Sequence, residues 1–485
     1  MLFSSLVFLT LFLPFTMLTY YLLKPWRQAQ NFFIFLVSLF FYAWGEPIFV
    51  LILVFSIFLN WGLGLFVEKS TGKRMQRRVV LILSLALNLG IMYYFKYHMF
   101  TLSILKTWFP YLEIPFIRLP IGISFFTFQA LSYVLDIYMG KVQANKNPFQ
   151  VGLYIALFPQ LIAGPILRYE TIAEQINSRK ENIADFSHGL VRFVMGLGKK
   201  VLLANQFALI SEESVRRVSY GAVTPSGAWV GILAYAFQIL FDFSGYSDMA
   251  IGLGKMMGFH FPENFDHPYI SVSVSEFWRR WHISLGTWFR EYVYFPLGGS
   301  RVSHKGRVTF NLFVVWALTG IWHGANWTFI VWGIFYFLLI AIEKAIAYEK
   351  YLVANGFPGW LMRRIGHFYT MTSVLVGWVL FRAASLRDAW CYLGVMFQQS
   401  LFQGLQPDAR MILGENKVFF IAAFLACFPW NEWFSSYSPK APHWFVFILN
   451  LAKGVVLTMG VLLILVLSVT YLVKGSYNPF IYFNF

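Results

Sequence analysis

Residues 308–342 read VTFNLFVVWALTGIWHGANWTFIVWGIFYFLLIAI and contain no Lys, Arg, Asp or Glu. About 20 apolar residues cross a bilayer as a helix, so this stretch predicts two short membrane elements, 308–323 and 326–342. At their junction lies His323, the one side chain of the stretch that titrates near neutral pH. Because a titratable ring at membrane depth costs free energy, a functional role is the first hypothesis for His323.

The whole chain has the composition of a membrane protein. It has 485 residues, of which 58% are hydrophobic and only 12% are charged, whereas a soluble domain carries roughly 25% charged residues. We assign the formal net charge of +16 to cytoplasmic loops. Attraction of an anionic substrate or of membrane lipids is a second use, and we expect no nucleic acid partner. The composition therefore predicts an all-α polytopic membrane protein.

Applied along the chain, the length rule predicts about 11 to 13 membrane elements. The first, 4–23, has no basic stretch before it and no small-residue cleavage site after it, so we interpret it as a retained span. Two basic segments, Lys24–Arg27 and Glu68–Arg78, should face the cytoplasm, which places the N-terminus and the Gly45–Pro47 turn outside. The other predicted elements are 30–45, 47–67, 79–95, 119–139, 149–166, 187–210, 225–243, 308–323, 326–342, 369–384, 416–432 and 444–474, the last being one long tilted helix or a surface helix followed by a span.

Several predicted elements are interrupted. One helix should break at Leu161-Ile-Ala-Gly-Pro165, and Phe241-Asp-Phe-Ser-Gly-Tyr-Ser-Asp248 puts two acids at the edge of a span. Broken backbone at membrane depth is tolerated only where it packs in protein or lines a cavity. We therefore predict one integral domain, 1–485, with broken or re-entrant helices around a central chamber. Its parts are N-terminal spans in 1–140, core motifs in 141–345 and C-terminal spans in 346–485.

A second histidine lies in a segment that mixes arginines with aromatics. Ser273-Val-Ser-Glu276 matches a capping box and opens a predicted helix over 277–294. An interfacial anchor is the plain interpretation of such a helix. His282, however, precedes His323 by 41 residues, which hold one basic loop and one short span, so the chain can bring both imidazoles into one chamber. At 3.6 residues per turn, one stripe of the helix holds Trp278, His282, Leu285 and Phe289.

The polar residues around these histidines have two interpretations each. A lone histidine in an apolar helix is more often a satisfied core residue than a catalyst, and this applies above all to His282. Asn326 is a candidate partner of the His323 ring. Asp242 and Asp248 either pair with nearby arginines or cap a helix, or one of them orients an imidazole or an acceptor hydroxyl. Two His and two Asp would suffice for a metal, but no HExxH or HxH spacing supports a metal site, so we expect none.

Five motifs in sequence order carry a family resemblance. They are Phe158-Pro-Gln-Leu-Ile-Ala-Gly-Pro-Ile166, Phe241-Asp-Phe-Ser-Gly-Tyr-Ser-Asp-Met-Ala-Ile-Gly-Leu-Gly254, Glu276-Phe-Trp-Arg-Arg-Trp-His-Ile-Ser-Leu285, Leu297-Gly-Gly-Ser-Arg301 and Trp322-His-Gly-Ala-Asn326. Together they resemble the membrane-bound O-acyltransferase (MBOAT) superfamily, in its bacterial alginate O-acetylation branch, over at least residues 1–345. The resemblance implies an MBOAT-like helical bundle. It also implies that His323 is the essential histidine and that His282 occupies a second polar motif position.

The resemblance implies acyl transfer across the membrane. The expected donor substrate is acetyl-CoA from the cytosol, with no tightly bound cofactor, and the acceptor is a hydroxyl outside. That acceptor is commonly an exported polysaccharide, reached through a partner such as an extracytoplasmic SGNH-type acyltransferase. The arginines and lysine near His282 would receive the phosphates of coenzyme A, or they simply follow the positive-inside rule. These residues are Arg279, Arg280, Arg290, Arg301, Lys305 and Arg307.

The implied chemistry agrees with the residues. A neutral imidazole at position 323 can remove the hydroxyl proton, which contributes about 10²–10⁴-fold. Asn326 or His282 would orient this ring or donate to the developing oxyanion, and an acetyl-imidazole intermediate is left open.

Other functions are also left open by the sequence. A transporter or lipid-linked glycan flippase would use His323 and Asp242 as a proton relay, although no internal repeat supports it. Within the superfamily, D-alanylation of teichoic acid, or acylation of a lipid or protein, differs in the acceptor. For each of these functions we expect the protein in the bacterial cytoplasmic membrane.

Overall fold

The computed structural model describes residues 1–302, 304–352, 356–400, 404–430, 443–475 and 477–481. Within these residues every regular element is a helix, and the one β-type pairing is an isolated bridge between Phe265 and Trp281. A helix satisfies its backbone N–H and C=O groups within one segment, which a bilayer requires. The predicted all-α fold is confirmed.

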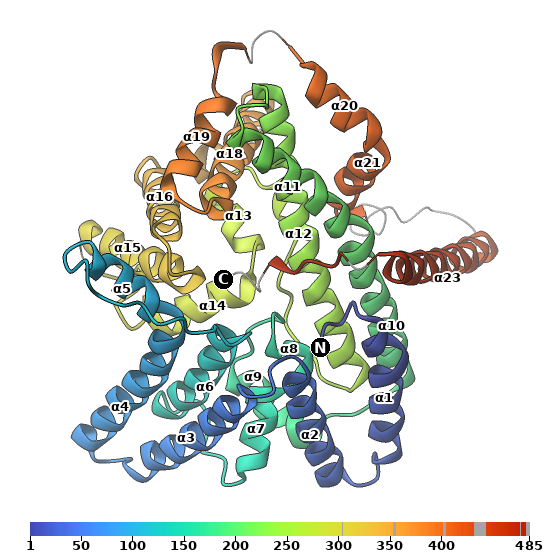
Figure 1. Cartoon of the computed structure of the whole chain (residues 1–485). Coiled ribbons are helices and arrows are strands. Elements are labelled where there is room, and N and C mark those ends of the chain that lie inside the picture. Colours follow the sequence, from blue (N-terminus) through green and yellow to red (C-terminus); the bar gives the residue numbers. More distant parts are fainter. Residues whose placement is uncertain (303, 353–355, 401–403, 431–442, 476, 482–485) are drawn as a thin grey trace.

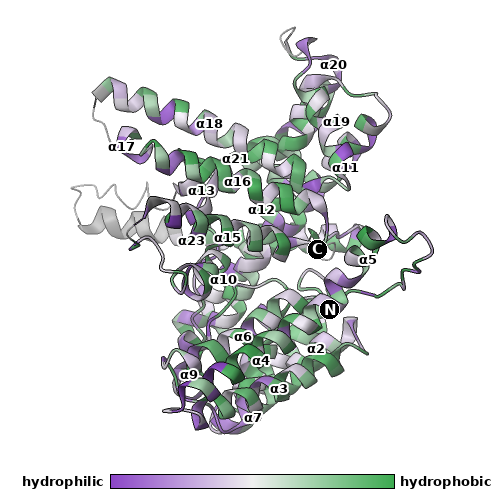
Figure 2. Cartoon of the chain, turned by 90° about the vertical axis from the view of Figure 1, so that its left-hand side faces the viewer, coloured by the Kyte–Doolittle hydropathy of each residue, from purple (hydrophilic) through white to green (hydrophobic). Residues whose placement is uncertain are grey.

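Six of the described helices are long and apolar enough to cross a membrane. Most helices are rich in hydrophobic residues, shown in green in Figure 2. The remaining predicted elements form helices that are shorter, broken or more polar than these six. Length and composition therefore give fewer spans than the 11 to 13 elements that we predicted. The six spans are Val50–Lys69, Arg74–Lys106, Ile183–Val218, Pro225–Met256, Trp327–Ala345 and Gly454–Lys474.

The N-terminal part forms a group of helices in the lower half of Figure 1. Its two basic connectors, 24–26 and 70–73, lie at the same end of this group, as the charge pattern predicted (Figure 1). The predicted span 79–95 is too short, because a π-helix joins its neighbours into one continuous helix that places Lys96 inside it. The elements are η1 (Phe8–Phe12), α1 (Leu13–Leu22), α2 (Arg27–Gly45), α3 (Val50–Lys69), α4 (Arg74–Met92), η2 (Tyr93–Tyr97) and α5 (His98–Lys106).

The central helices include the predicted break and one correction. α8 (Phe158–Leu161) ends before Gly-Pro, as expected. Asp242 and Asp248 do not mark the edge of a span, because α12 (Pro225–Met256) continues through both. Cations from α10 and η3 pair with these carboxylates, so the helix can bury Asp242 and partly bury Asp248. The other central elements are α6 (Ile123–Tyr138), α7 (Pro148–Ala156), α9 (Tyr169–Ser178), α10 (Ile183–Gly198), η3 (Lys199–Ala204) and α11 (Asn205–Ser219).

The predicted continuous helix over 277–294 is wrong. α13 (Val274–Arg280) and α14 (Ile283–Phe289) are separate helices, and His282 between them has a left-handed backbone with a φ of 48°. The loop before α13 causes this break, since the N–H of Asp266 donates to the Arg280 carbonyl (3.0 Å) and the N–H of Ile283 donates to the Asn264 carbonyl (2.9 Å). Next come η4 (Pro268–Ile270), which precedes α13, and η5 (Arg290–Tyr294), α15 (Lys305–His323) and α16 (Trp327–Ala345), which follow α14.

The capping box is half confirmed. The Ser273 hydroxyl oxygen accepts the N–H of Glu276 at 3.0 Å, as predicted for an N-cap. The Glu276 carboxylate accepts the N–H of Val272 at 3.0 Å rather than that of Ser273.

The C-terminal helices end in a chain segment that returns to the centre of the molecule. α23 (His443–Lys474) is one long helix, which decides between the two predictions for this run, and it projects from the body in Figure 1. After it, Asn478 donates to Ser4 at 2.9 Å and the N–H of Ile481 donates to Asp242 at 2.8 Å. The preceding elements are α17 (Glu349–Leu352), α18 (Gly356–Arg382), α19 (Leu386–Met396), α20 (Pro407–Glu415) and α21 (Lys417–Ala426).

Candidate functional site

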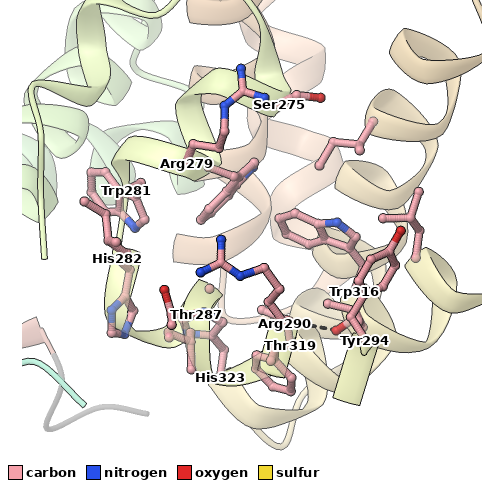
Figure 3. Close-up of a pocket in the computed structure, with 18 of the residues that line it drawn as sticks. Ser275, Arg279, Trp281, His282, Thr287, Arg290, Tyr294, Trp316, Thr319 and His323 are labelled. Atoms are coloured by element: carbon pink, nitrogen blue, oxygen red, sulfur yellow. Dashed lines mark hydrogen bonds between the residues drawn. The ribbon is translucent and has the colours of Figure 1, made fainter. Parts of the chain in front are cut away.

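His282 and His323 line the same cavity. This cavity has a volume of about 490 Å³ and is lined by α13, α14, η5, α15 and α16. His323 ends α15, and its side chain and that of His282 reach the cavity from neighbouring segments (Figure 3). Both residues are nearly inaccessible to bulk solvent, since His282 has 2% and His323 has 5% of its surface exposed. The predicted meeting of the two imidazoles in one chamber is therefore present in the structure.

Asn264 determines which nitrogen of His282 carries the proton. The Asn264 Oδ1 atom accepts the backbone N–H of Ser284 at 3.2 Å, which identifies this atom as the amide oxygen. The same oxygen lies 3.1 Å from His282 Nδ1. An amide oxygen only accepts, so His282 Nδ1 must donate and Nε2 must hold the lone pair. His282 Nε2 is buried and has no hydrogen-bond partner among the described residues.

His323 is held by aromatic rings. Its ring centroid lies 5.0 Å from those of Trp322 and Trp332 and 5.1 Å from that of Phe381, all in edge-on arrangements. Its Nδ1 atom is buried and lacks a hydrogen-bond partner among the described residues. Buried polar atoms without partners are uncommon in native proteins and call for an explanation. Each of the two histidines therefore has one buried ring nitrogen without a partner among the described residues.

Among the described residues, three cations line this cavity, and two of them were predicted. Arg279 and Arg290 are present as expected, and Lys344 joins them from α16 (Figure 3 labels the two arginines). Arg279 also pairs with Glu349 at 2.7 Å, on an exposed side. These cations form a basic wall suited to an anionic group.

The other predicted cations lie elsewhere. Arg280 pairs with Asp266 at 2.7 Å and with Glu276 at 3.0 Å. Arg301 is exposed, and Arg307 donates to the Leu297 carbonyl at 3.4 Å. The described residues that line the cavity include none of these three. The side chain of Lys305 lies outside the described residues.

Asn326 and Asp242 also lie away from the described lining of the cavity. Asn326 is the N-cap of α16, where its oxygen accepts the N–H of Thr328 at 3.1 Å, and it donates to the Ala384 carbonyl at 2.8 Å. Asp242 pairs with Lys200 at 2.7 Å, and both side chains are buried. These contacts correct the expectation that Asn326 orients the His323 ring, and they give Asp242 a structural partner.

His323 also reaches a second, much smaller cavity. This cavity has a volume of about 20 Å³ and is lined by Lys96, Ser124 and Trp322 among others. His323 is the one described residue that lines both this cavity and the large one. The imidazole is therefore not sealed within side-chain packing. Among the described residues, no group of three or more His, Cys, Asp or Glu side chains is placed to hold a metal ion.

Sequence reasoning missed Asn264, Lys344 and Lys96. Asn264 lies in an ordinary Pro-Glu-Asn-Phe loop, and nothing in its local pattern points to a histidine 18 residues later. Lys344 lies two residues after the predicted element 326–342, and Lys96 directly follows the predicted span 79–95. Neither residue therefore fell within a predicted membrane element.

Comparisons with known proteins place the chain in a family. Residues 142–348 match the family described as MBOAT, membrane-bound O-acyltransferase. A Pseudomonas putida protein named "Probable alginate O-acetylase AlgI" is 38% identical over 100% of both chains. A Helicobacter pylori peptidoglycan O-acetyltransferase is 33% identical, over 80% of this chain and 78% of its own. A Streptococcus thermophilus teichoic acid D-alanyltransferase is 28% identical, over 56% and 69%.

The chain belongs to the membrane-bound O-acyltransferase family, which confirms the resemblance carried by its motifs. It is a multi-pass integral membrane protein and an acyltransferase that acts on oxygen acceptors.

Proposed function

We propose that this protein takes an acetyl group from cytosolic acetyl-CoA and passes it through the cytoplasmic membrane to a hydroxyl for O-acetylation of an exported polysaccharide. The position of His323 between two cavities is the observation that supports this most strongly. A transfer between compartments needs a reacting group that two substrates can approach separately.

The large cavity is the proposed donor side. Its basic wall of Arg279, Arg290 and Lys344 suits the phosphates of coenzyme A. Arg and Lys both bind phosphate, and Arg does so through two parallel hydrogen bonds. The thioester would then lie toward the two histidines. Arg280, Arg301 and Arg307 are left as positive-inside residues or structural partners.

The proposed chemistry is general base catalysis. His323 removes the proton of the acceptor hydroxyl, the oxygen attacks the thioester carbonyl, and the C–S bond breaks as the C–O bond forms. The thiolate leaves and takes the proton from His323, so thioester and alcohol become ester and thiol and the imidazole is neutral again. His282 presents a lone pair at Nε2, so we propose it as a second proton acceptor and not as the donor to the oxyanion.

Transport is a weaker interpretation of the same residues. A relay between His323 and Asp242 would need both in one polar path. Asp242 is instead paired with Lys200 and accepts the N–H of Ile481.

The acceptor and partner are proposed from the relatives. The names of two relatives refer to O-acetylation of alginate and of peptidoglycan, so a polysaccharide acceptor is the favoured one. A soluble SGNH-type acyltransferase outside the membrane is the proposed partner that completes the transfer. The D-alanyltransferase relative makes a different acyl group the main competing outcome.

His323→Ala tests the proposed function. We expect this variant to lose O-acetylation of the exported polymer, and turnover of labelled acetyl-CoA in proteoliposomes, by at least about 10²-fold, the lower range for a general base. His188→Ala changes an exposed histidine and serves as the matched control. If a well-inserted His323→Ala protein retained acetylation, the base assignment would be wrong. If the wild-type protein used another thioester instead, the donor would need to be reassigned.

A further inference from the structure

Lys96 is a buried cation without a carboxylate partner among the described residues. It lies in the π-helix η2, inside the continuous helix Arg74–Lys106, and only 8% of its surface is exposed. Its Nζ atom donates to the Trp322 carbonyl at 2.6 Å and to the Ser124 hydroxyl at 3.1 Å. Charged side chains at membrane depth are costly and usually functional, and π-helical turns are frequent at functional sites.

The place of Lys96 connects it to the proposed base. Trp322 directly precedes His323, and Lys96 lies 5.8 Å from the centre of the Trp322 ring. Lys96, Ser124, Trp322 and His323 line the small cavity together. When Lys96 is protonated, its ammonium group has three N–H donors, so one remains after the two hydrogen bonds to described residues. The Ser124 hydroxyl accepts from Lys96 and keeps its own proton to donate.

The small cavity also lies toward the predicted outer face. Its lining residues Pro120 and Gly122–Ser124 follow a loop in which Arg118 pairs with Glu46 at 3.1 Å. In the same segment, the Ile121 carbonyl accepts the hydroxyl of Tyr42 at 3.0 Å. The charge pattern places the turn that contains Glu46 outside the membrane. A volume of about 20 Å³ is enough for one water molecule or one hydroxyl group.

We propose that Lys96 positions the acceptor hydroxyl in the small cavity for attack on the acyl donor. This inference rests on the proposed function. The third N–H of Lys96 donates to the acceptor oxygen, which turns the hydroxyl proton toward His323. When His323 takes that proton, the nearby ammonium stabilises the oxygen as it gains negative charge. Lys96 keeps its own proton throughout, so the transfer balances as described above.

A purely structural role makes a different prediction for the Lys96→Met variant. Lys96 donates to a carbonyl in the last turn of α15, where cations favour a helix end. If this cap were its whole role, Lys96→Met would lower stability and leave the chemistry intact. If Lys96 serves the acceptor, Lys96→Met should lower acetyl transfer by more than any loss of folded protein explains.

The test compares Lys96→Met with wild type in three measurements. These are the thermal midpoint in detergent, the Kd for coenzyme A, and the O-acetyl content of exported polymer in cells that lack the native gene. We expect a Kd within twofold and at least a tenfold loss of O-acetyl content per folded molecule, whatever the shift in the thermal midpoint. Ser124→Ala, a smaller change that cannot disturb packing much, should lower the O-acetyl content by at least twofold. Lys106→Met, on an exposed part of α5, is the matched control.

Two results would overturn the inference. One is an O-acetyl content within twofold of wild type in a well-expressed Lys96→Met strain. The other is a lower thermal midpoint together with an unchanged O-acetyl content per folded molecule, which would make Lys96 a helix cap. Either result leaves the proposed function standing as long as His323→Ala abolishes acetylation. If His323→Ala retained acetylation, the proposed function itself would fail.

Discussion

At the scale of single residues, Asn264 holds the ring of His282 and selects its tautomer. The third member of a catalytic triad acts on its histidine in the same way. His282 itself has a left-handed backbone, at 48° in φ, a conformation that costs free energy in residues with a side chain and that concentrates at functional sites. The surrounding hydrogen bonds of Asn264 to Ser284 and Ser247 maintain it.

Asn264→Ala should therefore lower kcat by at least tenfold, because Nε2 of His282 would no longer be held as the acceptor. Turnover of labelled acetyl-CoA in proteoliposomes measures this. Asn264→Asp keeps an acceptor oxygen and should lose less activity than Asn264→Ala. Asn177→Ala, at an exposed site, is the control. Equal activity of Asn264→Ala and wild type would remove Asn264 from the site.

Arg290 and Arg280 separate donor binding from structure. Arg290→Gln removes a cation from the wall of the large cavity, whereas Arg280→Gln removes one that pairs with Asp266 and Glu276. A charged hydrogen bond is worth about 1.5–3 kcal/mol, so the KM for acetyl-CoA should rise about tenfold or more in Arg290→Gln. The KM should change less than threefold in Arg280→Gln. Similar KM values in both variants would contradict the donor assignment.

At the scale of elements, two glycines bring α15 and α16 together beside His323. A Cβ added at Gly333 would lie 2.5 Å from the Trp316 carbonyl oxygen and 3.2 Å from the Cα of Gly320. Close approach of small residues is a common way for helices to pack in a membrane. The position of α15, and hence of the imidazole at its end, depends on this contact.

Gly333→Ala should push the two helices apart and cost about 1–3 kcal/mol of stability, the usual range for overpacking. The thermal midpoint in detergent measures the loss, and acyl transfer should fall with it because His323 moves. Gly90→Ala provides the comparison, since nothing lies within 4 Å of its added Cβ. That variant should be as stable as wild type, and an equal loss in both would argue against a specific role for the α15–α16 contact.

At the scale of the whole molecule, the two cavities indicate from which side of the membrane each substrate would approach. The small cavity lies beside the loop that packs on Glu46. The basic wall of the large cavity includes Lys344, which follows His323 by 21 residues and lies near the C-terminal end of α16. A bilayer around this molecule would then separate donor and acceptor. The charge rule assigns the basic connectors to the cytoplasm.

Cysteine labelling tests this direction. Lys73→Cys and Glu113→Cys lie at exposed sites before and after the long helix Arg74–Lys106. In a background without Cys391 and Cys427, a membrane-impermeant maleimide should label Glu113→Cys in intact spheroplasts. It should label Lys73→Cys only after permeabilisation. The reverse pattern would invert the orientation, and equal labelling of both would contradict opposite sides.

Much of the fold and part of the site were predictable from local pattern. The lengths of the apolar runs predicted the helices. One predicted span ended at residue 95, just before Lys96, whereas in the structure a π-helix continues this helix. The charge-free stretch around His323 singled out this residue. The prediction that His282 and Trp278 share one helical stripe was wrong, because hydrogen bonds from the loop at Asn264 break the helix between them.

By itself, the sequence determined that this is a helical membrane protein with a buried histidine at its centre. A bilayer permits few backbone structures, and it penalises every titratable group. The tertiary structure alone decided which groups surround that histidine. Asn264, Lys96 and Lys344 join the site, while Asp242 and Asn326 take structural partners. These assignments depend on contacts between residues up to 239 positions apart. Local periodicity in a sequence indicates that a side chain is buried, but it does not indicate which side chains contact it.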